Sequence, residues 1–206
     1  MADRLRPLWD FDDLDSTERR LSDLVAAEQS DAGRAEVLTQ LARVEGLRED
    51  FDASERLLQQ AEALAGTSDL ARVRIDLERG RKLRSSGDPA AALPLFEAAY
   101  ARASDAGQDF LAGDAVHMCA ISVDEVEAKE EWTRRGLDLG ERRPAATYWA
   151  GPLLNNLGWA YYDAGDHRRA LGLFEQALEV RLRDPENEAA IAFAREAVET
   201  ARQAVT

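Results

Sequence analysis

The stretch "GDPAAALPLFEAA", Gly87–Ala99, returns almost unchanged as "GDHRRALGLFEQA", Gly165–Ala177. Eight of the thirteen positions carry the same residue, and each match lies 78 positions after its twin. Self-similarity at a fixed spacing is typical of repeat proteins, in which one small unit stacks on the next. The two stretches therefore predict a solenoid and locate two of its units.

The true period is about half of that spacing. Gly80 and Gly158, one helix earlier, are also 78 positions apart. A step of 38 residues back from the first copy pairs Ala42 with Gly80, Ser54 with Ala92, Leu58 with Phe96 and Ala61 with Ala99. A further copy should lie near 109–141. Its register stays open, because Ala128 and Trp132 fit the Ala-x3-Phe spacing of the other copies but a shift by one residue fits as well.

The chemistry of the repeated positions predicts that each unit is a helical hairpin. Small residues such as Gly80 and Gly158 on the first helix allow a close crossing, and the bulky Phe96 and Phe174 on the second helix fill the space. Each connecting turn offers a Gly for a left-handed helix end and an Asp to cap the next helix. Such a hairpin cannot bury its apolar face alone, so successive hairpins must stack on one another.

The last copy, "LLNNLGWAYYDAGDHRRALGLFEQAL", resembles a tetratricopeptide repeat, with seven residues on that family's spacing: Leu157, Gly158, Tyr161, Gly165, Ala170, Phe174 and Ala177. The resemblance is strongest over 151–182 and weakest over 109–141. Leu154 stands where the family often has Trp. The period exceeds 34 residues and the family's closing Pro is missing, which suggests lengthened, kinesin-light-chain-like repeats. The whole chain also resembles bacterial tetratricopeptide proteins of unassigned role, and this closer resemblance adds no activity to the reading.

This resemblance implies an all-α fold, a right-handed α-α superhelix of about four hairpins with capping helices at both ends. We expect a single domain over 1–206, divided into an N-terminal lead-in and helix (1–31), four repeats (32–66, 67–106, 107–142 and 143–184) and a C-terminal capping helix (185–206).

The end pieces carry their own signals. Asp15 and Glu18 stand at capping-box spacing and predict a helix over 15–29. Trp9, Phe11 and Leu14 of the lead-in should pack against the first helices. A final helix after Asp184 and Pro185 places five apolar residues on one face, Ile191, Ala194, Val198, Ala201 and Val205, to cover the last repeat.

Pro152 allows two readings. It either opens the helix that runs through Trp159, or it kinks a longer helix that begins at Pro144, and the kink is slightly favoured.

Composition excludes several classes of function. The net charge is -14, from 40 acidic and 26 basic residues, which opposes binding to nucleic acid or to an anionic membrane. No apolar run approaches the roughly 18 residues of a membrane span, and the first residues lack the apolar core of an export signal. A single cysteine, Cys119, suits the reducing cytoplasm, where we expect the protein to reside.

Catalytic and metal-binding patterns are missing. His117 and Cys119 are two apart on a helix and do not face each other, and with His167 they are too few for a zinc site. The acidic run from Asp10 lacks the Gly and Glu of a calcium loop. We therefore expect no enzymatic activity, no catalytic residue, no metal and no cofactor.

What remains is the concave groove that the resemblance implies, where first helices line a face that takes peptides or partner helices. The family's groove positions fall on Glu36, Gln40, Arg43, Arg74, Glu78, Arg81, Asp114, His117, Asn155, Asn156 and Trp159. From these we select Arg43, Arg74, Arg81, His117, Asn155, Asn156 and Trp159 as candidate partner-binding residues. Asn156 matches an Asn that peptide-binding members use, and Trp159 either contacts a ligand or packs inside the hairpin.

The stretch between Arg72 and Arg84 holds six bases and two acids, against the acidic balance of the chain. Its arginines either form a basic strip in the groove, suited to a partner's carboxylates, or pair with acids of neighbouring helices. The leading hypothesis is a non-catalytic scaffold that binds a peptide or protein in the groove. Self-assembly into a dimer or filament and a peptide-sensing regulator are the alternatives, so the protein could be a monomer or a dimer.

Overall fold

The structure is a computed structural model that describes residues 3–185 and 187–205. Within these residues it is all-helical, with no strand. Ten α-helices follow one another: α1 Leu14–Ala27, α2 Asp31–Leu47, α3 Phe51–Ala65, α4 Asp69–Ser85, α5 Pro89–Asp105, α6 Asp109–Ala120, α7 Val126–Arg142, α8 Ala150–Asp163, α9 His167–Arg181 and α10 Glu188–Val205. Two short 3-10 helices, η1 (Arg6–Leu8) and η2 (Pro144–Trp149), precede α1 and α8.

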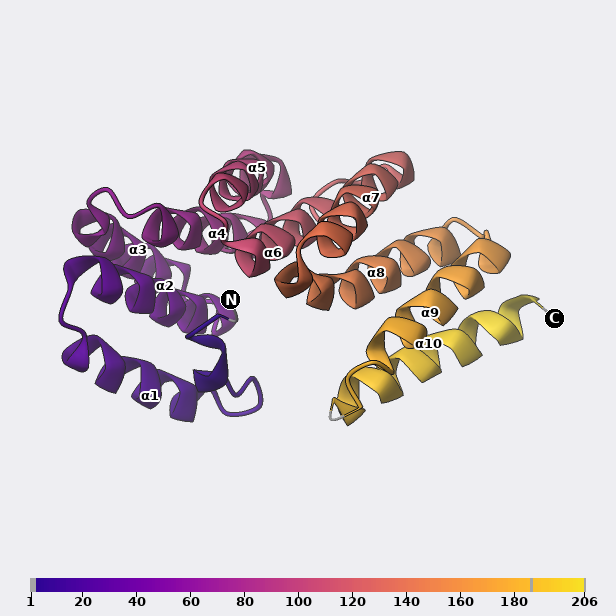
Figure 1. The fold of residues 1–206 in the computed structure, drawn as a ribbon, viewed down its shortest axis with the longest axis horizontal. Helices are drawn as coiled ribbons and strands as arrows, with labels where there is room; N and C mark the ends of the chain where they lie inside the picture. Colours follow the sequence, from indigo (N-terminus) through magenta and orange to yellow (C-terminus); the bar gives the residue numbers. More distant parts are fainter. Residues whose placement is uncertain (1–2, 186, 206) are drawn as a thin grey trace.

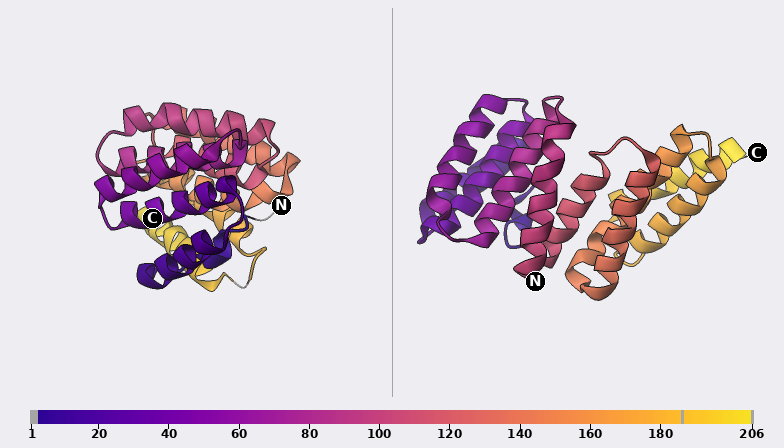
Figure 2. Two further views of the ribbon diagram at one scale, coloured as in Figure 1. Left: turned by 90° about the vertical axis from the view of Figure 1, so that its left-hand side faces the viewer. Right: turned by 90° about the horizontal axis from the view of Figure 1, so that it is seen from above.

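The helices stack into an arch, as the repeat predicts. Consecutive helices pack on each other, and in addition α2 contacts α4, α4 contacts α6 and α6 contacts α8. Figure 1 shows α4, α6 and α8 as a row beneath α5 and α7, with α1 and α10 at the two ends of the arch. Two further views in Figure 2 show the same succession of packed helices. The helical repeat solenoid is therefore confirmed.

The close helix crossing is the feature that the repeated small residues predict, and it is present twice. A Cβ atom added at Gly80 would lie 2.5 Å from Cε1 of Phe96, and one added at Gly158 would lie 2.5 Å from Cε1 of Phe174. Both rings are fully buried. The aromatic ring thus occupies the space that the missing side chain leaves.

The turns between these helices also follow the sequence. Gly87 and Gly165 have φ values of 96° and 84°, in the left-handed region that glycine adopts without strain. The carboxylate of Asp88 accepts a hydrogen bond from the N–H of Ala91 at 3.0 Å, and that of Asp166 accepts one from Arg169 at 3.0 Å. Both residues are helix caps, as predicted.

The third copy of the repeat, whose register the sequence left open, is the hairpin of α6 and α7, and it has a bulky buried residue at the expected position. Trp132 is buried on α7 and meets the ring of Tyr100 edge-on, 6.2 Å between centroids. The register with Ala128 and Trp132 on the Ala-x3-Phe positions agrees with this burial. Cys119 stands 39 positions before Gly158 and is fully buried on α6.

The predicted capping box at Asp15 and Glu18 is wrong. Helix α1 begins one residue earlier, and its cap is Asp13, whose carboxylate accepts from the N–H of Ser16 at 2.9 Å. Asp15 and Glu18 instead both pair with Arg48, the C-cap residue of α2, with 2.7 Å between Arg48 and Glu18. The two acids thus fasten α1 to the next helix, a role that local spacing does not reveal.

The longer helix kinked at Pro152 is also wrong. Residues 144–149 form a 3-10 helix, and α8 begins at Ala150, so Pro152 lies in the first turn. A proline there costs no intrahelical hydrogen bond, because the first N–H groups of a helix have no intrahelical partner.

The C-terminal helix α10 covers the last hairpin, as predicted. It packs on α9, and four of the five predicted apolar residues are buried while Val205 is partly exposed.

Candidate functional site

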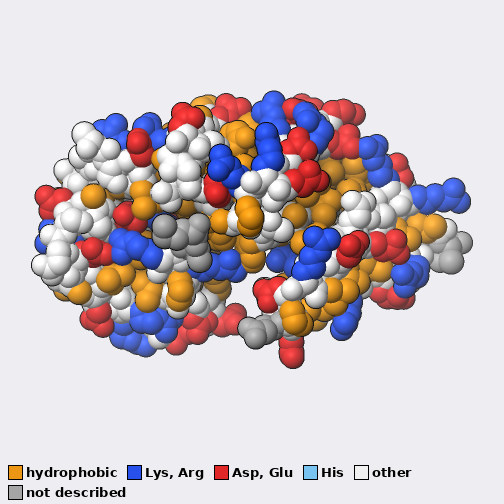
Figure 3. Space-filling view, in the orientation of Figure 1, with side chains coloured by type: hydrophobic (Ala, Val, Ile, Leu, Met, Phe, Trp, Pro, Cys, Tyr) orange, Lys and Arg blue, Asp and Glu red, His pale blue; other side chains and the backbone are white. Residues whose placement is uncertain are grey.

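Most of the predicted groove residues meet on the inner side of the arch. They come from the first helices of successive hairpins, α2, α4, α6 and α8. Figure 3 shows a hollow at the lower edge of the molecule, between the N-terminal helices and the α9–α10 pair. The inner wall divides into two parts of different chemistry, which we describe in turn.

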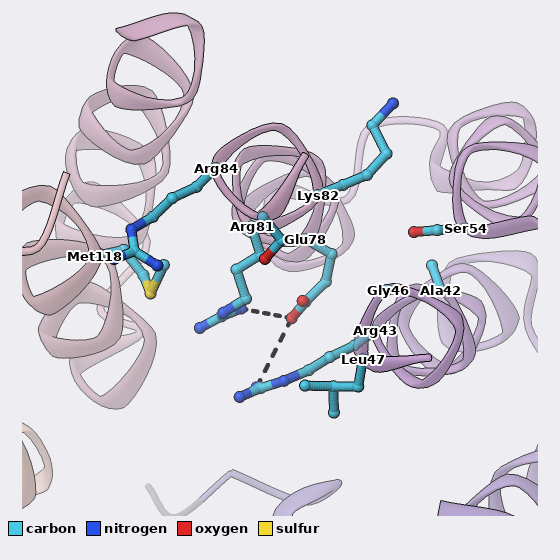
Figure 4. A pocket seen from close by; sticks show the side chains of 11 residues that line it. Ala42, Arg43, Gly46, Leu47, Ser54, Glu78, Arg81, Lys82, Arg84 and Met118 are labelled. Atoms are coloured by element: carbon cyan, nitrogen blue, oxygen red, sulfur yellow. Dashed lines mark hydrogen bonds and ion pairs between the residues drawn. The ribbon is translucent and has the colours of Figure 1, made fainter. Parts of the chain in front are cut away.

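In the N-terminal part, the basic strip is paired with acids. The guanidinium of Arg81 binds both carboxylate oxygens of Asp114 on α6, at 2.5 and 2.6 Å, and Oε1 of Glu78 at 2.6 Å. Arg43 of α2 approaches the same Glu78 oxygen at 4.0 Å (Figure 4). The Arg81 side chain is only 14% exposed. Of the two readings of this strip, ion pairing between neighbouring helices is the one that the geometry shows.

Burial and charge act in opposite directions on these arginines. Burial alone would lower the pKa of Arg81, but the carboxylates of Asp114 and Glu78 raise it above its ordinary value. Burial and the nearby Arg81 instead lower the pKa of Arg43, which Glu78 only partly offsets. Arg81 therefore links α4 to α6 through its ion pair, and the carboxylates of Glu78 and Asp114 compensate its charge.

The N-terminal lead-in crosses this part of the inner wall, which the sequence did not reveal. We call residues 3–11 the N-terminal strap. Its Asp3 carboxylate binds the buried Arg74 of α4 at 2.5 Å, and the indole N–H of Trp9 donates to Oε1 of Gln40 on α2 at 3.0 Å. Burial would raise the pKa of Asp3, but the hydrogen bond and charge of Arg74 lower it.

Further contacts extend the strap toward the middle of the arch. Arg4 pairs with Glu36 at 3.2 Å, and the Arg6 guanidinium carbon lies 3.9 Å from the ring centroid of Tyr148 in η2. The predicted packing of Trp9 and Leu14 against the first helices is confirmed, whereas Phe11 stacks on Trp9 and stays 60% exposed. The strap thus covers the wall where Arg43 and Arg74 lie.

The second part of the inner wall is a cavity of about 180 Å³, which we call the C-terminal cavity. It lies between α6, α8, α9 and α10, and its lining includes His117, Asn155, Asn156, Arg181 and Phe193. The side-chain amide of Asn156 lies 2.9 Å from Nε2 of His117. Three predicted groove residues therefore share one cavity.

His117 is held as a neutral ring. Its ring stacks on Trp149, with 5.1 Å between centroids. Burial lowers the pKa of His117 to about 4, because the nearby Asp114 only partly offsets burial and the charges of Arg81, Arg84 and Arg43. The amide N–H of Asn156 can donate to Nε2 of the neutral ring, which then carries its proton on Nδ1.

Trp159 lies apart from both sites. Its ring packs on Phe174 of α9, 4.9 Å between centroids, and on Tyr162 at 5.4 Å. It does not line the C-terminal cavity. Packing inside the hairpin is therefore the reading of Trp159 that the contacts favour.

Arg181 is a cavity residue that sequence reasoning missed. It lies on the second helix of its hairpin, α9, whereas the family's groove positions were transferred only to first helices. Its guanidinium approaches Gly151 of α8, where an added Cβ would lie 2.7 Å from Nε. The signal in the sequence was the unexplained glycine at the start of α8.

Among the described residues, no three His, Cys, Asp or Glu side chains are grouped to hold a metal ion, and no helix is long and apolar enough to cross a bilayer. Burial raises the pKa of the Cys119 thiol, which keeps it in its unreactive protonated form.

Comparison with known proteins identifies one part of the chain. Residues 153–183, which span most of α8, α9 and the turn between them, match the model of the tetratricopeptide repeat family. A search of curated proteins finds no match. The hairpin α4–α5 repeats the glycine-to-phenylalanine crossing of the matched hairpin. Residues 153–183 therefore match a tetratricopeptide repeat, within a chain that stacks as a helical repeat solenoid.

Proposed function

We propose that this protein is a non-catalytic scaffold that binds a segment of a partner protein along the inner side of its arch. The family supports a role in protein–protein interaction. The finer proposal is that the segment enters the C-terminal cavity. One observation carries it: the cavity combines amide and imidazole groups with Phe193, which is 57% exposed at its rim.

The chemistry of this cavity suits a peptide. The side chains of Asn155 and Asn156 offer both donors and acceptors, which is what the backbone of a bound peptide requires. Phe193 offers apolar surface to a partner side chain. We assign Arg43, Arg74 and Arg81 a supporting role in this proposal, because their charges already bind carboxylates of the chain and hold the wall in shape.

Selection of peptides from a phage-displayed random library on the full chain tests the proposal. We expect related sequences to be enriched, and Asn156→Ala and Phe193→Ala to weaken the selected peptides by about tenfold each, since each removes a contact worth about 1.4 kcal/mol. Arg183→Ala, on the exposed end of the chain's last repeat, is the matched control and should bind as the wild type does. Enriched peptides that bind both cavity variants normally would contradict the proposal.

Self-assembly is the second candidate, favoured by the exposed apolar residues Phe193 and Leu182, 57% and 49% exposed, near the C-terminal end. Light scattering across a concentration series separates the two. A dimer that dissociates when Phe193 is replaced by Ser would support assembly through this surface, whereas a monomer at all concentrations would reject it.

A further inference from the structure

Arg181 differs from the other arginines of the inner wall. Arg74 binds Asp3 and Arg81 binds Asp114, each at 2.5 Å. Among the described residues, no carboxylate oxygen lies within 4.0 Å of a guanidinium nitrogen of Arg181. Among the described residues that line the C-terminal cavity, none is acidic. A half-buried positive charge thus lies in a cavity whose walls do not neutralise it.

The guanidinium of Arg181 lies close to two neighbours. On one side it approaches Gly151 so closely that a Cβ there would lie 3.0 Å from Cζ. On another side its Cζ lies 5.5 Å from the ring centroid of Tyr148. Because a glycine and an aromatic ring confine it, Arg181 loses little freedom when it binds a ligand.

The cavity also holds polar atoms without partners. Oδ1 of Asn155 and Nδ1 of His117 are buried and have no hydrogen-bond partner among the residues that the structure describes. When Nε2 of His117 accepts from Asn156, Nδ1 carries a proton and is a buried donor. Buried polar groups without a partner are costly, so a ligand that supplies an acceptor and an N–H would be stabilised here.

We propose that Arg181 forms an anion subsite of the C-terminal cavity, and that its ligand is a carboxylate of the bound partner segment. A carboxylate offers two oxygens that can accept parallel hydrogen bonds from a guanidinium, and such charge-assisted bonds are about twice as strong as neutral ones. The carboxylate belongs to an Asp or Glu side chain or to a C-terminus. This inference rests on the proposed function and specifies the segment's chemistry.

Small carboxylates test the subsite without a partner. The full chain, labelled with ¹⁵N, is titrated with N-acetylglycine, which presents a C-terminal carboxylate, and with the α-amide of N-acetylaspartate, which presents a side-chain carboxylate. The α-amide of N-acetylasparagine is the uncharged control. We expect saturable shifts of the side-chain amides of Asn155 and Asn156 with one or both carboxylates and none with the control.

Arg181→Gln should raise the dissociation constant about tenfold, because a charge-assisted hydrogen bond contributes about 1.5 kcal/mol or more. Arg183→Gln, on the exposed neighbour that pairs with Glu179, is the matched control and should leave binding unchanged. Arg181→Lys keeps the charge but not the forked geometry, and it should bind with intermediate affinity. If circular dichroism shows that the Gln variant does not fold, Arg181→Lys provides the test instead.

The outcomes separate the two proposals. The absence of saturable shifts, or equal binding by wild type and both Arg181 variants, would overturn the subsite even if selected peptides bind the cavity. Carboxylate binding that depends on Arg181, together with a peptide selection that enriches nothing, would uphold the subsite and reject the proposed partner segment.

Discussion

Gly158→Ala should destabilise the last hairpin even though alanine is the better helix former. The added Cβ would lie 2.5 Å from Cε1, 2.7 Å from Cδ1 and 3.1 Å from Cζ of Phe174. The ring is fully buried and cannot turn away, so we place the cost of overpacking near the upper end of its usual range, about 3 kcal/mol. The gain in helix propensity is about 1 kcal/mol. The net loss of unfolding free energy is therefore about 2 kcal/mol.

Gly172→Ala is the matched control, because Gly172 lies within α9 and nothing stands within 4 Å of an added Cβ. It should gain about 1 kcal/mol from propensity alone, so that the two variants differ by about 3 kcal/mol. Urea unfolding, followed by far-ultraviolet circular dichroism, measures the unfolding free energy of both variants. The slope of this free energy against urea concentration should not change. In a Phe174→Leu background the Gly158→Ala loss should shrink. A Gly158→Ala variant as stable as the wild type would refute the role of the ring.

Three further predictions concern the buried polar groups. Stability should fall as the pH drops from about 6.5 to about 4, because unfolded His117 binds a proton that the folded ring resists; in His117→Gln, urea unfolding should show a weaker pH dependence over that window. Arg81→Met should cost about 3 kcal/mol or more in the same assay, since it leaves Glu78 and Asp114 buried without their partner; a small loss would mean that water reaches both carboxylates. Cys119 should resist alkylation by iodoacetamide in the native protein and react only after unfolding; rapid native labelling, followed by mass spectrometry, would contradict its burial.

The arch could be predicted from sequence because its rules are local and repeated. Gly87 with Asp88, and Gly165 with Asp166, determine where one helix ends and the next begins. The pairing of Gly158 with Phe174 follows from the spacing within one hairpin. Outside the repeats the local pattern misleads. Asp15 and Glu18 have the spacing of a capping box, but in the structure both pair with the distant Arg48.

The candidate site was less predictable, because its decisive contacts join residues far apart in the chain. Asp3 reaches Arg74 across 71 positions, and no periodicity marks either residue as the other's partner. The pairing of Arg81 with Asp114 depends on the copy whose register the sequence left open. Arg181 was not predicted because it fits into the cavity only where Gly151, on another helix, has no side chain.

The ion pairs of the inner wall have a mechanical consequence. Glu78 of α4 reaches back toward Arg43 on α2, while Arg81 of α4 grips Asp114 on α6, so three neighbouring helices are tied together on the side that faces the hollow. Ties on the inside of a curved stack resist its unbending. We therefore expect these ion pairs to limit changes in the curvature of the stack, so that disrupting them should widen the hollow.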